Sequence, residues 1–106
     1  MDFNLKFIKS ENQLNKIIKK QKRDGSLVRL LFVSLWDKWS NSLVASLKKN
    51  DTSKGTLLYV IDSFTMPHSF VIYKTRKTPS LVTLGKRQGS VSVDDHLPSI
   101  HDSLGI

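Results

Sequence analysis

Cysteine is absent from the 106-residue chain. The chain therefore has no disulfide bond, no thiol nucleophile and no thiolate ligand for a metal ion. Its three histidines, His68, His96 and His101, lack the spacing of a metal site, and neither cysteine nor a matching carboxylate pair supports them. The sequence thus predicts no bound metal and no other cofactor.

Long apolar runs are also missing, because no stretch approaches the roughly 18 residues of a membrane span. The N-terminus has an acid at Asp2 and no basic region ahead of an apolar block, so it does not resemble a secretory signal. We therefore expect a cytoplasmic protein with no membrane partner. The sequence has neither a nucleophile elbow nor a glycine-rich phosphate loop, and it predicts no enzyme.

Acidic residues are scarce, with 9 Asp and Glu against 17 Lys and Arg, which gives a formal net charge of +8 and a pI near 9.9. Such an excess favours association with an acidic partner, whether nucleic acid, an anionic surface or an acidic protein face. It carries no information about the fold.

The basic residues form an early group and a late group. They are Lys16, Lys19, Lys20, Lys22 and Arg23 in the first, and Lys74, Arg76, Lys77, Lys86 and Arg87 in the second. Both groups are candidates for anion or nucleic-acid contact. The alternative is a solvated surface, since basic runs are common on helices, where they complement the negative end of the helix dipole.

Hydrophobic periodicity and turn residues divide the chain into alternating elements. Strands are predicted at residues 3–8, 27–35, 56–61, 80–84 and 90–93. Helices are predicted from Ser10, a capping residue, to Asp24, and at residues 37–49, 64–73 and 95–104. This order predicts an α/β domain with a mixed central sheet of about five strands and helices on both faces.

The segment from Arg29 to Ser40 organises this pattern. Its apolar run predicts a strand buried on both faces, and the run ends abruptly in two tryptophans, an aspartate, a lysine and a serine. In open α/β sheets, sites form beyond the carboxyl ends of strands, where the next helix presents free N–H groups. We therefore expect a working surface that begins at Trp36.

The whole chain, residues 1–106, resembles a single domain of the thioredoxin-like family. The features that carry the resemblance are a buried strand ending in Trp36 directly before a helix, a strand ending at Asp62, Thr78-Pro79 opening a strand, a glycine-flanked hairpin at Gly85–Gly89 and a short final helix. The resemblance rests on this arrangement of elements rather than on long identical segments.

Four positions depart from the family pattern. Asp37 and Ser40 stand where the family has the two cysteines of its Cys-x-x-Cys motif, and Leu31 and Leu58 stand where the resemblance places a buried acid and its lysine companion. Thiol–disulfide exchange requires an attacking thiolate and a resolving thiol, and neither Asp nor Ser replaces them. The resemblance therefore implies a redox-inactive member.

The resemblance also implies a substrate-docking groove. Pro79 would be a cis-proline, and Thr78 would offer its backbone to an extended peptide in the manner of an added strand. Trp36 and Trp39 would supply rigid contact area beside it. The alternatives are that Trp36 is simply packed and that Thr78-Pro79 persists because the fold needs the turn.

The residues between the tryptophans have two interpretations. Asp37 is either a permanent anion that imitates the family's reactive thiolate at the positive end of a helix dipole, or an N-cap of that helix. Ser40 is interpreted as a small substitution that the site accommodates.

The leading hypothesis is a binding module for a protein with an acidic or extended-peptide surface. Its predicted contact residues are Trp36, Asp37, Lys38, Trp39, Ser40, Thr78 and Pro79. The alternative is a basic nucleic-acid-associated protein. The small size, the composition and the altered active site would suit a viral or phage protein acting in the host cytoplasm.

Overall fold

The computed structural model describes residues 3–25, 27–34, 36–49, 51–52, 55–62, 78–85 and 91–105. The strands in these residues are β1 (Phe3–Ile8), β2 (Val28–Val33), β3 (Thr56–Asp62), β4 (Ser80–Leu84) and β5 (Val91–Asp94). The helices are α1 (Glu11–Asp24), α2 (Lys38–Lys48) and α4 (Leu97–Leu104). The helix predicted at residues 64–73 lies outside the described residues.

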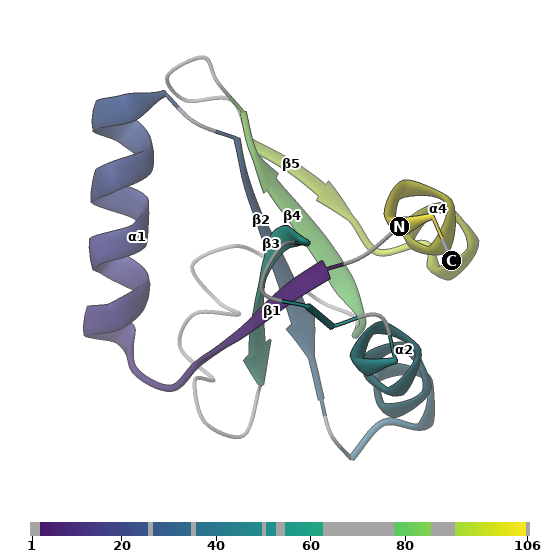
Figure 1. Cartoon of the computed structure of the whole chain (residues 1–106). Coiled ribbons are helices and arrows are strands. Elements are labelled where there is room, and N and C mark those ends of the chain that lie inside the picture. Colours follow the sequence, from purple (N-terminus) through teal and green to yellow (C-terminus); the bar gives the residue numbers. More distant parts are fainter. Residues whose placement is uncertain are drawn as a thin grey trace.

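The strands form one mixed sheet in the order β1-β3-β2-β4-β5. β3 is parallel to both β1 and β2, whereas β4 is antiparallel to both β2 and β5. Helix α1 lies on one face of the sheet, and α2 and α4 lie on the other (Figure 1). The predicted fold class, an α/β domain with a mixed five-stranded sheet and helices on both faces, is confirmed.

Strand β2 lies in the middle of the sheet and is buried from Leu30 to Val33. Because side chains alternate along a strand, Leu30 and Phe32 pack in the cluster beneath α1, and Leu31 and Val33 pack in the cluster beneath α2 and α4. The apolar run thus forms a strand buried on both faces, as predicted.

Helix α1 begins and ends as its sequence indicates. The Ser10 hydroxyl accepts a hydrogen bond from the Gln13 backbone N–H at 3.2 Å, and Gln13 Oε1 accepts one from the Lys9 N–H. Gly25 ends the helix in the left-handed region, at φ 67°, where glycine pays no Cβ penalty. Leu14, Ile17 and Ile18 then face the sheet.

Several element boundaries differ from the prediction by one or two residues. The central strand ends at Val33 rather than residue 35, and α2 begins at Lys38 because Asp37 is its N-cap. The last helix begins at Leu97 rather than Asp95, with Pro98 in its first turn. The chain turns before it, where the Asp94 carboxylate accepts hydrogen bonds from the His96 N–H and the Ser99 hydroxyl.

Candidate functional site

The predicted site residues come together at one end of the sheet. Trp36 to Ser40 join the carboxyl end of β2 to α2, and Thr78-Pro79 lead directly into β4, the antiparallel neighbour of β2. The Thr78 hydroxyl donates a hydrogen bond of 3.1 Å to Asp37 Oδ2, which joins two segments 41 residues apart. Seven predicted partner-binding residues therefore belong to one contiguous region.

The Asp37 carboxylate is the centre of this region. Its Oδ1 accepts a 3.2 Å hydrogen bond from the Trp39 backbone N–H, which is the N-cap interaction expected at the start of a helix. Its Oδ2 accepts from the Ser40 and Thr78 hydroxyls, each at 3.1 Å. Asp37 thus caps α2 and at the same time ties the helix to the segment before β4.

Ser40 is fully buried beneath this carboxylate. Its hydroxyl donates to Asp37 Oδ2 and accepts a 3.2 Å hydrogen bond from the Ser34 N–H. Both hydrogen-bonding roles of the hydroxyl are therefore occupied within the protein. Ser40 links the end of β2 to the first turn of α2, and its burial excludes direct attack on a bound molecule.

The two tryptophans lie at the surface. Trp36 exposes 83% and Trp39 57% of their surface, and the Lys38 ammonium lies 5.7 Å from the centroid of the Trp39 ring, within cation–π range. The interpretation of Trp36 as a packed side chain is therefore wrong. On the same helix, Leu43 and Leu47 are buried, whereas Trp39 is exposed.

The Thr78-Pro79 segment has the geometry that the resemblance implies. The peptide bond between Thr78 and Pro79 is cis, Pro79 is buried, and Thr78 is half-buried. Ser80, the first residue of β4, is paired with Phe32 of β2. The Thr78 backbone thus lies beside the carboxyl end of β2.

An apolar core replaces the charged pair that the family resemblance would place beneath the site. Leu31 and Leu58 are both fully buried and belong to the same hydrophobic cluster as Val33 and Leu43. With leucine at both positions, this pair offers no carboxylate or ammonium to exchange a proton with a group at the surface. Together with the absence of cysteine, this excludes thiol–disulfide chemistry by the chain's own side chains.

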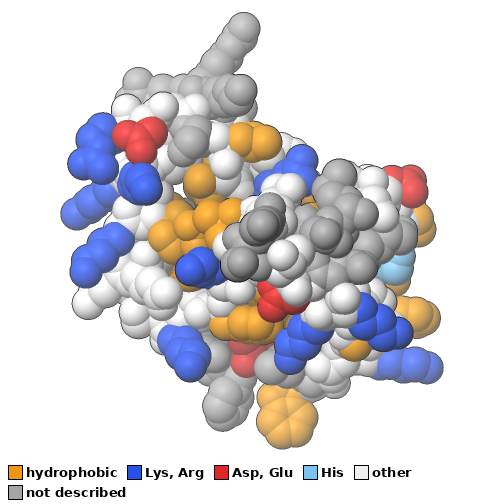
Figure 2. Space-filling model, in the orientation of Figure 1, with side chains coloured by type: hydrophobic (Ala, Val, Ile, Leu, Met, Phe, Trp, Pro, Cys, Tyr) orange, Lys and Arg blue, Asp and Glu red, His pale blue; other side chains and the backbone are white. Residues whose placement is uncertain are grey.

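The early basic group lies apart from the tryptophans. All five of its residues are exposed on α1, on the face of the sheet opposite α2, and Figure 2 shows basic side chains along this helix. Arg23 also approaches Asp24 at 3.6 Å, an exposed pair of little energetic consequence. The late group, Lys74, Arg76, Lys77, Lys86 and Arg87, lies outside the described residues.

The described residues contain neither a candidate metal site nor a candidate membrane span. No cluster of three or more His, Asp or Glu side chains in these residues is arranged to hold a metal ion. No helix in the same part of the chain is long and apolar enough to cross a membrane.

Sequence reasoning missed two features, one in this region and one outside it. The bond between Asp37 and Thr78 has no local signal, because it joins distant segments, although the resemblance does place both residues at one site. A cavity on the other face of the sheet, lined by Ile17, Lys20 and Tyr59 among others, has no motif at all.

Comparison with known proteins gives structural matches only. No protein-family model matches the chain, and no curated protein sequence matches it significantly. A thioredoxin h from Nicotiana alata superposes with a TM-score of 0.75 at 10% identity, over 98% of this chain and 92% of that one. A wild-type poplar thioredoxin h gives 0.70 at 17% identity, over 96% and 94% of the two chains.

The germline-specific thioredoxin Deadhead of Drosophila melanogaster gives a TM-score of 0.62 at 24% identity, over 94% of this chain and 96% of that one. At these identities the likeness concerns the fold alone. The sheet order, the helices on both faces and these superpositions together establish that the chain has a thioredoxin-like fold, in a form without cysteine.

Proposed function

We propose that this protein is a redox-inactive thioredoxin-like binding module that recognises a protein partner through the surface formed by Trp36, Lys38, Trp39, Thr78 and Pro79. The observation that carries the proposal is the pair of exposed tryptophans beside the segment that Asp37 holds through Thr78. An exposed tryptophan is costly to leave in water, and it is a typical anchor of protein interfaces.

The chemistry of this surface supports an extended and acidic partner. The two indole rings offer large contact area at a low cost in side-chain entropy, and Lys38 places a positive charge against one of them. The net charge of +8 favours approach of an acidic partner. An extended peptide would add main-chain hydrogen bonds at Thr78 and insert apolar side chains between the tryptophans.

Asp37 and Ser40 support this surface from below in the proposal. Their side chains form hydrogen bonds with Trp39, Thr78 and Ser34 within the protein. Their proposed role is therefore to hold the surface in place rather than to contact the partner directly. Thiol–disulfide exchange within the chain does not regulate the surface, because the chain has no cysteine.

A quantitative capture experiment tests the proposal. The wild type, a Trp36→Ala/Trp39→Ala variant and a Val91→Ala/Val93→Ala variant are used to capture proteins from a cell lysate. The two valines are matched controls because they are exposed apolar residues of β5, at 55% and 46%. We expect a captured protein whose yield falls at least tenfold with the tryptophan variant and stays within twofold with the valine variant; identical yields would contradict the proposal.

A nucleic-acid-associated function is the second candidate, favoured by the five exposed basic residues of α1. Binding through phosphates would fall steeply with salt, because each neutralised phosphate releases counterions. The test is titration of a 30-base-pair DNA duplex at 20 mM and 200 mM salt. Absence of binding at the lower concentration would eliminate this candidate.

A further inference from the structure

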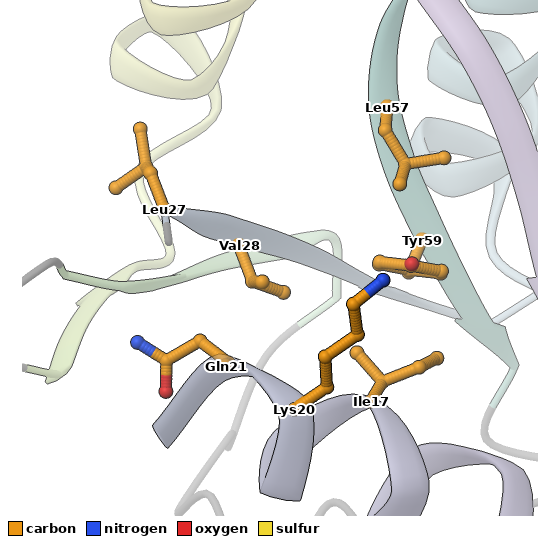
Figure 3. Close-up of a pocket in the computed structure, with 7 residues that line it drawn as sticks. All are labelled: Ile17, Lys20, Gln21, Leu27, Val28, Leu57 and Tyr59. Carbon is orange, nitrogen blue, oxygen red and sulfur yellow. The ribbon is translucent and has the colours of Figure 1, made fainter. Parts of the chain in front are cut away.

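A cavity of about 220 Å³ lies between α1 and the sheet. Its walls come from the last turns of α1 and from the first residues of β2 and β3, as Figure 3 shows for Lys20, Val28 and Tyr59. Trp36 and Thr78 lie at the other end of β2, so the cavity is a separate feature from the proposed docking surface.

The walls of the cavity are mainly apolar. Leu27 and Leu57 expose 48% and 40% of their surface, although leucine is usually buried, and Ile17 and Val28 are partly exposed beside them. Figure 2 shows apolar side chains exposed next to the basic side chains of α1. An apolar ligand that covered these side chains would be stabilised by the hydrophobic effect.

Two polar groups converge at one side of the cavity. The ammonium group of Lys20 is directed toward the hydroxyl end of Tyr59 (Figure 3). Within the part of the chain that the structure describes, neither group has a hydrogen bond or an ion pair. An ammonium and a phenol that line the same cavity are two donors, and such a pair suits an anionic oxygen.

The surroundings keep these donors available. A tyrosine hydroxyl is protonated at neutral pH, and burial raises the pKa of the Tyr59 hydroxyl further, so the group can donate. Gln21 forms a fixed part of the wall, because its side-chain amide donates a 2.7 Å hydrogen bond to the Gly85 carbonyl. The other exposed cations of α1 add to the positive potential that an anion meets on approach.

We propose that this cavity binds a small amphipathic carboxylate, such as a medium-chain fatty acid anion, with its chain against Leu27 and Leu57 and its carboxylate between Lys20 and Tyr59. The volume of the cavity limits the size of the ligand. At about 220 Å³ it lies below the range of about 300–1,000 Å³ that is typical of pockets for drug-sized ligands, so the ligand must be small. The inference does not depend on the proposed docking function.

The test is an NMR titration of the ¹⁵N-labelled full chain with octanoate, kept below its micelle concentration. We expect saturable amide shifts at Ile17, Gln21, Val28 and Tyr59. Octanol, which has the same chain length but no charge, should bind more weakly. A Lys20→Gln variant should bind octanoate about fivefold more weakly, the upper end for an exposed charge pair.

A Lys19→Gln variant is the matched control, because Lys19 is exposed on the same helix and does not line the cavity. Its affinity should stay within twofold of the wild type. The Trp36→Ala/Trp39→Ala variant should also bind octanoate normally, which separates this inference from the docking surface. Absence of saturable shifts, equal binding of octanol, or equal losses in the Lys19 and Lys20 variants would each overturn the proposal.

Discussion

Replacing Asp37 with alanine should remove the hydrogen bonds that hold the first turn of α2 and the segment before β4, and so destabilise both. The substitution removes an N-cap, which is worth about 1 kcal/mol, together with the acceptor of two hydroxyls, one of them the fully buried Ser40. A hydrogen bond to a charged group contributes about 1.5–3 kcal/mol when it is well shielded, and less when it is partly exposed. We expect the free energy of unfolding to fall by about 2–4 kcal/mol.

The link to Thr78 can be isolated by a double-mutant cycle. Thr78→Val removes the hydroxyl that donates to Asp37 Oδ2 and keeps the shape of the side chain. The cycle of Asp37→Ala with Thr78→Val should give a coupling energy of about 1 kcal/mol, as expected for residues in direct contact. The control is the cycle with Thr83→Val, a half-buried threonine of β4 that pairs with Arg29 and Ser92, far along the strand from Asp37.

Urea denaturation followed by far-ultraviolet circular dichroism is the appropriate assay. Tryptophan fluorescence is less suitable, because Trp36 and Trp39 are already exposed in the folded protein and unfolding changes their surroundings little. A coupling energy below about 0.3 kcal/mol, no larger than that of the control cycle, would show that the carboxylate does not join the two segments.

Three further outcomes are expected. Leu31→Asp should lower the stability by about 3 kcal/mol or more at pH 7, because it places a charge in an apolar cluster; a loss below 1 kcal/mol in urea would refute this. Trp39→Ala should change the stability by less than about 1 kcal/mol, since most of the ring is exposed, and a larger loss in the same assay would show that the ring supports the core. Because burial raises the pKa of the Tyr59 hydroxyl, the stability of the wild type relative to a Tyr59→Phe variant in urea should fall as the pH rises above 10, the ordinary value, and a difference that stays constant with pH would contradict this.

Local signals in the sequence predicted most of the described elements. The capping residue Ser10 and the glycine at position 25 set the ends of α1, and the apolar run before Trp36 identified the central strand. These signals work because caps and side-chain alternation depend on neighbours along the chain. The start of α4 was missed, because the Asp94 carboxylate bonds to His96 and Ser99 and keeps Asp95 outside the helix.

By itself, the sequence determined that thiol chemistry is excluded, and it determined the order in which strands and helices follow one another. The lack of cysteine removes thiol chemistry whatever the fold, and the burial of Leu31 follows from the apolar run around it. Only the tertiary structure decided that Asp37 bonds to Thr78 and that Lys20 faces Tyr59. Such pairs depend on strand order, register and helix placement, which the packing of the whole sheet fixes and no short stretch of residues encodes.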